Sequence, residues 1–300
     1  MIMVQGEVGG KVYSEPFSKG LLSRSLTRAE LDITEAYHIA SIIETKIQEE
    51  NIDIISTEDL AEMIVAELEK FNEEAALKYI NWRKFRNSKE PLIVLIGGAS
   101  GVGTSSVAFE IANCLGISNM ISTDMIREVM RKIISKDLAP VIHASSYNAY
   151  ESMRIPYPPE FDEVITGYKT HIDNIAVGVD AVIERALTEG ISIVIEGVHI
   201  VPGFIRQDLL DRNNVVLFTL QVSDPEVHKG RFYSRSSKLW ARRPLQKYLD
   251  NFSSIRKIQK YIVSQSQKYN VQVIENIDLA TTIDYMIKDI TANYSSLNKD

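Results

Sequence analysis

The spacing of apolar residues changes near residue 90 and divides the chain into two parts. In the first part, apolar residues recur at helical spacing, as in Ile33, Tyr37, Ala40, Ile43 and Ile47. In the second part, short runs rich in Val, Ile and Leu alternate with helical stretches, which is typical of a parallel α/β sheet. The pattern therefore predicts a small, mostly helical unit followed by a larger α/β unit.

The first part begins with two extended segments, residues 3–8 and 11–13, which flank Gly9-Gly10 and predict a hairpin. A further helix is expected after Ser56, where the sequence S-T-E-D resembles a capping box with Asp59 in place of Glu. The polar stretch that ends at Pro91 is the best linker candidate. We therefore place the domains at residues 1–87 and 91–300.

The second part predicts a three-layer domain around a five-stranded parallel sheet. A long helix is expected over residues 163–189, where Gly190 ends it. The expected strands are residues 92–96, 119–124, 191–195, 215–222 and 271–274.

Composition excludes several classes of protein. The formal net charge of −7 argues against general affinity for nucleic acid, because no basic field attracts a polyanion. We find no apolar run of the roughly 18 residues that a membrane span needs, and no signal-peptide core near the N-terminus. A single cysteine suits a reducing compartment. We expect a soluble, cytoplasmic protein, and the sequence leaves open whether it forms a homo-oligomer.

A glycine-rich stretch, PLIVLIGGASGVGTSS at residues 91–106, carries the strongest signal for chemistry. An apolar strand, a glycine turn and a helix in this order predict a phosphate-binding loop, with backbone N–H groups and the helix N-terminus facing the phosphates. Thr104 stands where the general motif has lysine. The residues expected to bind ATP are Gly98, Ala99, Ser100, Gly101, Val102, Gly103, Thr104, Ser105 and Ser106.

Two carboxylates follow predicted strands and are candidate magnesium ligands. Asp124 ends the strand that begins at residue 119, and Glu196 follows the strand at 191–195. Ligands of open α/β sheets bind at the carboxyl ends of the strands, so we expect Ser105 with Asp124 or Glu196 to hold Mg²⁺. A helix cap for Asp124 and a turn for Glu196 are the structural alternatives.

Residues 228–247 contain seven Lys or Arg and no acidic residue, which is a local excess in an acidic chain. Arg231 and Arg235 share one helix face at this spacing and could grip one polyphosphate. The segment looks like the mobile lid of a small-molecule kinase, although a solvated run of charge or, less well, a nucleic-acid patch would also fit. The expected catalytic residues are Asp124, Arg231, Arg235, Arg242 and Arg243.

A second group of residues suits an acceptor that carries its own phosphate. Arg127 and Arg131 share a helix face after Asp124, and guanidinium groups match phosphate oxygens. The structural alternatives are surface salt bridges for Arg127 and Arg131, loop capping for residues 143–147, and a structural role for His199. Its expected members are Arg127, Arg131, His143, Ser145, Ser146, Tyr147 and His199.

The first 87 residues resemble the ATP-cone, a regulatory nucleotide-binding module, through E-P-F-S-K-G at residues 15–20. The resemblance implies that Lys19, Arg24 and Arg28 lie near a regulatory nucleotide. The sequence leaves open whether such a nucleotide activates or inhibits. A solvated basic face is the alternative for these three residues.

The whole chain resembles the archaeal 2-phosphoglycerate kinases. The resemblance rests on GGASGVGTSS, STDMIREVMR, HASSYNAYES, IEGVHIVPG and RRPLQKYLDNFSSIRKIQKYI. That family carries Thr at the position of the motif lysine, in agreement with Thr104. The resemblance implies transfer of the γ-phosphoryl group of ATP to the 3-hydroxyl of 2-phosphoglycerate. A kinase for another small phosphorylated metabolite and a non-catalytic ATP-sensing protein stay open as alternatives.

Overall fold

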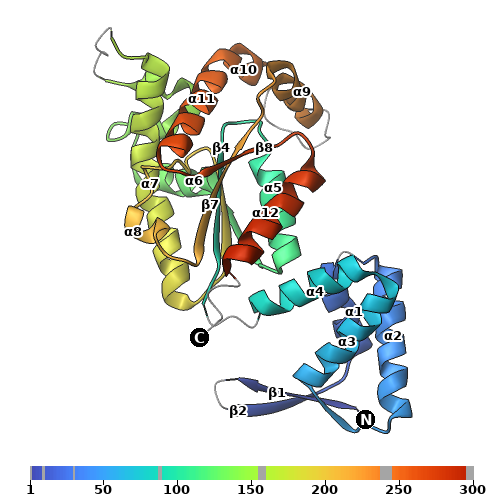
Figure 1. Ribbon diagram of the computed structural model, residues 1–300. Coiled ribbons are helices and arrows are strands. Elements are labelled where there is room, and N and C mark those ends of the chain that lie inside the picture. The colour runs from blue at the N-terminus through green and yellow to red at the C-terminus, as the bar shows by residue number, and fades with distance from the viewer. Residues whose placement is uncertain are drawn as a thin grey trace. The chain divides into compact units, whose positions relative to one another are not determined.

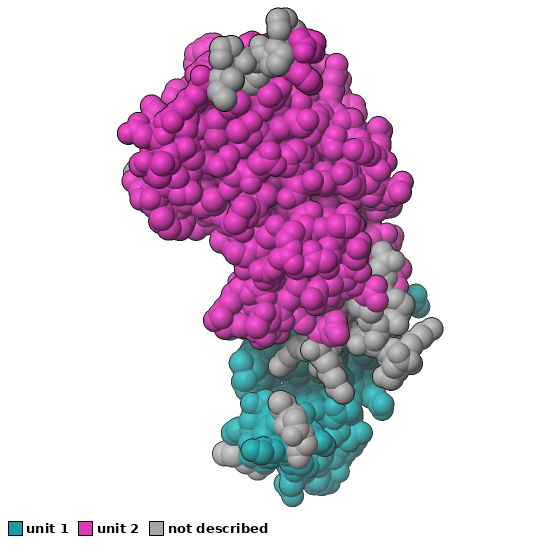
Figure 2. Space-filling view, turned by 90° about the vertical axis from the view of Figure 1, so that its left-hand side faces the viewer, with its two compact units in different colours: residues 1–88, 113–116 teal, residues 89–112, 117–300 magenta. Residues whose placement is uncertain are grey.

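The structure, a computed structural model, describes residues 2–8, 11–29, 31–86, 90–154, 160–236 and 245–294. The chain divides into two compact units (Figure 2). Unit 1 comprises residues 1–88 and 113–116, and unit 2 comprises residues 89–112 and 117–300.

Unit 1 packs helices against a small sheet of strand order β2-β1-β3. The expected hairpin is present, because β1 and β2 are antiparallel and pair Val8 with Lys11. The short β3, which the sequence pattern did not predict, pairs with β1 in parallel. The elements are β1 (Met3–Val8), β2 (Lys11–Pro16), α1 (Lys19–Leu26), the 3₁₀ helix η1 (Thr27–Ala29), α2 (Ile33–Glu49), β3 (Ile54–Ser56), α3 (Thr57–Phe71) and α4 (Glu73–Arg86).

Capping residues set the start of two of these helices. Ser56 caps α3 as expected, since its Oγ accepts from the N–H of Asp59 at 2.9 Å. Helix α2 begins with a complete capping box, in which Asp32 and Glu35 each accept the other's backbone N–H. The apolar face of α2, including Ile39, Ile43 and Ile47, is buried in the core of the unit.

Unit 2 alternates strands and helices, as the sequence pattern predicts. Its first half contains β4 (Ile93–Gly98), α5 (Thr104–Leu115), β5 (Asn119–Ser122), α6 (Thr123–Ile133), the 3₁₀ helices η2 (Pro140–His143) and η3 (Ser146–Ser152), and α7 (Glu163–Glu189). Its second half contains β6 (Ile193–Gly197), α8 (Gln207–Leu210), β7 (Val215–Gln221), α9 (Pro225–Ser236), α10 (Leu245–Asp250), α11 (Phe252–Lys268), β8 (Gln272–Glu275) and α12 (Leu279–Tyr294).

The sheet of unit 2 has five strands among the described residues, all parallel, in the order β5-β6-β4-β7-β8. Every residue of the central strand β4 is buried. In register, Ile96 of β4 lies beside Glu196 of β6, and Ser122 of β5 lies beside Glu196 on its other side. The topology therefore gathers the ends of β4, β5 and β6 at one edge of the sheet.

Helices cover both faces of this sheet, which confirms the expected three layers. Figure 1 shows α5 and α12 on one side of the sheet and α7 and α11 on the other. Helix α7 buries residues at helical spacing, among them Ile172, Ile175, Val179 and Ile183. It ends at Gly190 with φ of 67°, as the sequence pattern predicts.

Candidate active site

The phosphate loop (residues 98–105) joins β4 to α5. Gly101 and Gly103 have φ of 90° and 98°, a region that favours glycine. A Cβ at Gly103 would lie only 2.7 Å from Nδ2 of Asn276. Helix α5 begins at Thr104, so its first N–H groups lie at the loop. The predicted order of strand, glycine loop and helix is confirmed.

Glu196 at the end of β6 accepts hydrogen bonds from the hydroxyls of the first two residues of α5. Thr104 Oγ1 donates to Oε2 at 2.6 Å, and Ser105 Oγ donates to Oε1 at 3.0 Å. Glu196 is only 5% exposed, and charge-assisted bonds of this kind offset part of the cost of burying a carboxylate. Thr104 therefore uses its hydroxyl to join the loop to the neighbouring strand.

The same atoms form the oxygen donor set that magnesium prefers. Mg²⁺ is bound through one or two carboxylates together with phosphate oxygens and water, and Glu196 and Ser105 offer a carboxylate and a hydroxyl beside the loop. Asp124 lies in the first turn of α6, two residues beyond Ser122. No cluster of three or more His, Cys, Asp or Glu suited to a metal occurs among the described residues. The donors present fit a magnesium ion that is shared with a nucleotide.

Two carbonyls of the phosphate loop are held by side chains from the second half of the unit. The carbonyl of Ser100 accepts from Nε2 of His228 at 2.8 Å. The carbonyl of Val102 accepts from Arg231 at 2.6 Å and from Nδ2 of Asn276 at 2.7 Å. These carbonyls are occupied and so do not face a bound phosphate, whose oxygens they would repel.

His228 is fixed in one protonation state by its partners. The Ser100 carbonyl can only accept, so Nε2 carries the proton, and Nδ1 accepts from Arg256 at 3.2 Å. Burial lowers the pKa of His228, and Arg256 and Arg231 lower it further. Arg256 also donates to the carbonyls of Val222 and Ser223, both at 2.6 Å. This arrangement anchors the loop to the turn after β7.

Of the four lid arginines predicted to be catalytic, Arg231 is the one whose side chain lies within the described residues. Its guanidinium donates to the carbonyls of Val102 and Asn276 and, at 3.4 Å, to that of Ile277. These three contacts account for Arg231 without a ligand. Residues 237–244, with Arg242 and Arg243, and the side chain of Arg235 lie outside the described part, so the lid stays a prediction.

On the other side of Glu196, Arg127 contacts the segment that precedes η3. Its Nη1 donates to the carbonyl of Ala144 at 2.9 Å and to that of Ile142 at 3.3 Å. Its Nε is buried and makes no hydrogen bond to the described residues, and it lies 3.4 Å from Oδ1 of Asp124. Asp124 and Arg127 are thus adjacent at the end of β5, where an acceptor is expected.

The structure gives the other predicted acceptor residues partners within the protein. Arg131 forms a surface ion pair with Glu128 at 3.0 Å, which is the structural alternative to binding a phosphate. His143 is half-buried and donates from Nε2 to the carbonyl of Ile134 at 2.9 Å. Direct contact between His199 and a substrate does not fit its position, because its imidazole is fully buried.

The serine and tyrosine residues of this segment are mostly packed inward. Ser146 and Tyr147 are buried, and the ring of Tyr147 lies edge-on to Tyr248 at 5.9 Å between centroids. Ser145 is half-buried, and its backbone N–H donates to the side chain of Asn148 at 3.0 Å. A role in binding for these residues stays a prediction.

Comparison with known proteins adds to this geometry. A 2-phosphoglycerate kinase of Methanothermobacter thermautotrophicus is 63% identical over 97% of this chain and 95% of its own length. The chain belongs to the 2-phosphoglycerate kinase family. Members of this family from Methanocaldococcus jannaschii and Pyrococcus furiosus are 43% and 38% identical, over 97% and 92% of this chain and 92% and 89% of their own lengths.

Residues 10–88 of this chain match the model of the ATP cone domain family. Among solved structures, a shikimate kinase from Acinetobacter baumannii matches with a TM-score of 0.41 at 15% identity, over 73% of this chain and 99% of its own. A gluconokinase from Sinorhizobium meliloti matches with a TM-score of 0.40 at 17% identity, over 70% and 95%.

The basic residues expected at a regulatory nucleotide lie on and after α1. Lys19 forms an ion pair with Glu44 at 2.9 Å and lies over the ring of Tyr37. The hydrogen bond to Glu44 raises the pKa of Lys19. Arg24 is exposed, and the side chain of Arg28 lies outside the described part. Nucleotide binding by these residues stays a prediction.

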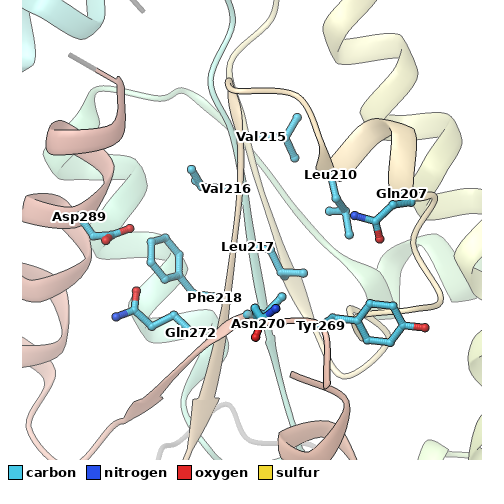
Figure 3. Close-up of a pocket in the computed structure, with 11 residues that line it drawn as sticks. Gln207, Leu210, Val215, Val216, Leu217, Phe218, Tyr269, Asn270, Gln272 and Asp289 are labelled. Carbon is cyan, nitrogen blue, oxygen red and sulfur yellow. The ribbon is translucent and has the colours of Figure 1, made fainter. Parts of the chain in front are cut away.

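A cavity of about 350 Å³ lies at the opposite end of the sheet from the phosphate loop. It is lined by Val215, the first residue of β7, which pairs with Ile93 at the start of β4. Figure 3 shows Val215 and Leu217 pointing toward α8, and Val216 and Phe218 pointing toward Asp289 of α12. The lining thus comes from both faces of the sheet, along residues 215–217 of β7, which β8 does not pair with, and at the first pair of the two strands, Phe218 and Gln272. This cavity is distinct from the candidate active site.

Sequence reasoning missed five residues that support the site: Thr123, His171, His228, Arg256 and Asn276. Arg256 lies within a stretch that carries the family resemblance, and Asn276 follows directly after a predicted strand. Position at a strand end was therefore an available signal for Asn276. The contacts of Thr123 and His171 depend on packing between α6, α7 and the end of β6, which no local pattern reveals.

The part of the chain that the structure describes contains no helix long and apolar enough to cross a membrane.

Proposed function

We propose that this chain transfers the γ-phosphoryl group of ATP to the 3-hydroxyl of 2-phosphoglycerate, giving 2,3-bisphosphoglycerate and ADP. The observation that carries the proposal is the 63% identity over nearly the full length to a 2-phosphoglycerate kinase. The glycine loop joined to Glu196 through two hydroxyls supports phosphoryl transfer. We also propose that the enzyme works in the cytoplasm on small molecules.

The reaction breaks the bond between the γ-phosphorus and the bridging oxygen of ATP and forms one from the acceptor oxygen to that phosphorus. Magnesium, when bound, would neutralise charge on the phosphate oxygens. Ser105 with Glu196 or Asp124 would hold the ion. The phosphate loop positions the donor phosphates, and Asp124 orients the acceptor hydroxyl or accepts its proton. Arg127 lies where it would bind the phosphate that the acceptor already carries.

We assign to the lid, residues 228–247, the role of stabilising the negative charge on the phosphoryl group during its transfer. In this proposal Arg235, Arg242 and Arg243 supply the cation that Thr104 lacks. Arg231, by contrast, is already engaged with the back of the loop. In unit 1, Lys19, Arg24 and Arg28 are proposed to bind a regulatory nucleotide, in keeping with the ATP cone match.

The test is a coupled assay of ADP release against a panel of phosphorylated hydroxy acids. ADP release that depends on 2-phosphoglycerate supports the proposal. Release with a different acceptor indicates a kinase for another phosphorylated metabolite. Tight ATP binding with no ADP release for any acceptor indicates an ATP-sensing protein and contradicts the enzymatic function.

A further inference from the structure

Two buried histidines form a hydrogen-bonded chain behind the acceptor side of the candidate site. His171 of α7 and His199, just beyond β6, lie 3.0 Å apart between their Nε2 atoms. His171 Nδ1 contacts the carbonyl of Val141 at 2.8 Å, and His199 Nδ1 contacts Oγ1 of Thr123 at 2.7 Å. Thr123 and both histidines are 0% exposed.

The proton positions in this chain follow from its two ends. The Val141 carbonyl can only accept, so Nδ1 of His171 carries a proton and its Nε2, in the neutral ring, is an acceptor. Nε2 of His199 must then donate to His171, and Nδ1 of His199 must accept from the hydroxyl of Thr123. Burial lowers the pKa of His171 to about 4, and burial also lowers the pKa of His199. With both rings neutral, as burial favours, every donor in this hydrogen-bonded chain meets an acceptor.

The hydrogen bonds of His171, His199 and Thr123 join three segments that carry the predicted acceptor residues. Thr123 is the first residue of α6 and precedes Asp124. Val141 belongs to residues 140–144, the same segment whose carbonyls accept from Arg127. His199 follows the strand that carries Glu196, and a Cβ on Gly197 would collide with Oγ1 of Thr123.

We infer that His171, His199 and Thr123 are positioning residues, which set Asp124 and Arg127 for the acceptor without touching it. The inference rests on the proposed function, because it takes the acceptor to be a phosphorylated hydroxy acid. Thr123 is held by its hydrogen bond to His199 and by close packing of its side chain against Gly197. A shift at Thr123 therefore moves the start of α6, which carries Asp124 in its first turn and Arg127 just after it.

The deciding variant is Thr123→Val, which keeps the shape of the side chain and removes the hydroxyl. We expect the KM for the acceptor to rise about tenfold, while the KM for ATP changes by less than about twofold, since one buried acceptor atom loses its partner. Thr123→Ser restores the hydroxyl and should restore the acceptor KM. Thr219→Val is the matched control, because it removes a buried hydroxyl contact to Ser266 at 2.8 Å, and that contact has no link to the histidines.

A second measurement does not depend on activity. Nitrogen-15 spectra of the imidazoles in the full chain should show a neutral ring protonated at Nδ1 for His171 and a neutral ring protonated at Nε2 for His199. Any other pair of tautomers overturns the hydrogen-bonded chain.

Kinetic outcomes separate the two proposals. If wild-type protein releases no ADP with any acceptor, the proposed function fails, and the positioning role fails with it. If wild-type protein is active and Thr123→Val leaves the acceptor KM unchanged, or raises both KM values alike, only the positioning role is overturned.

Discussion

The donor side and the acceptor side of the candidate site are both held through backbone carbonyls, but by different chemistry. On the donor side, Arg231 and Asn276 hold Val102, and His228 holds Ser100 with Arg256 behind it. On the acceptor side, Arg127 holds residues 142 and 144, and behind it lies a pair of neutral histidines with no arginine in the hydrogen-bonded chain.

This difference shows that a basic residue near a phosphate site can bind either a ligand or the backbone of the loop. A guanidinium has five N–H donors and no acceptor, so a backbone carbonyl satisfies it as readily as a phosphate oxygen does. The guanidinium of Arg231 donates to backbone carbonyls, whereas the buried Nε of Arg127 makes no hydrogen bond among the described residues and lies 3.4 Å from the carboxylate of Asp124. We therefore expect Arg127 to act on a ligand and Arg231 to act on the loop.

The largest expected effect belongs to Glu196, which lies between the two sides. Glu196→Gln removes the charge that the hydroxyls of Thr104 and Ser105 contact and weakens the proposed metal site. We expect kcat to fall about 100-fold or more, a size typical for loss of one preorganised electrostatic group. The measurement is steady-state ADP release, with circular dichroism as a check on folding. If the variant keeps a near-normal kcat, Glu196 takes no part in the chemistry and does not link the donor side to the acceptor side.

Arg127→Ala should act on the acceptor side alone. Loss of a charged hydrogen-bonding group predicts a rise of about 30-fold in the acceptor KM and little change in the KM for ATP. Arg131→Ala is the matched control, because it removes an arginine from the same helix that is paired with Glu128 at the surface. Equal effects of the two substitutions would contradict the assignment of the acceptor phosphate to Arg127.

Arg231→Ala should act on the donor side alone, with a rise of about tenfold in the KM for ATP. Asn276→Ala removes the other donor to the Val102 carbonyl and should act in the same direction. Because both residues hold one atom, the effect of the double variant should be non-additive. If Arg231→Ala instead lowers kcat at saturating ATP, the residue contacts the transferring group, and the lid interpretation of Arg231 is restored.

Local patterns in the sequence predicted the elements and the donor loop because each depends on neighbours in the chain. Short apolar runs predicted the strands, and glycine spacing predicted the loop, in which the structure gives Gly101 and Gly103 positive φ. Glu196 could be placed beside Ser105 since the ends of parallel strands converge. Asp32 and Glu35 carry a capping signal of the same local kind, which an inspection of spacing could have found.

Contacts that depend on packing could not be predicted in this way. Arg231 and Val102 are far apart in the chain, and charge alone assigned that arginine to a phosphate. The pairing of His171 with His199 requires the place of α7 against the end of β6, together with the path of the 3₁₀ segments between α6 and α7. Strand β3 has only three residues, which are too few for a repeat of apolar and polar positions to be recognised.

The smallest expected effect is that of Thr104→Lys, which restores the cation of the general phosphate-loop motif. Thr104 donates to a buried carboxylate at 2.6 Å, so a lysine there loses that hydroxyl and places its charge beside Glu196. If the lid supplies the cation for the γ-phosphate, the added charge is redundant, and kcat should stay within about threefold of wild type or fall. Thr104→Ser, which keeps the hydroxyl, is the control. A gain of about tenfold or more in kcat would show that the donor side lacks a cation that the lid does not provide.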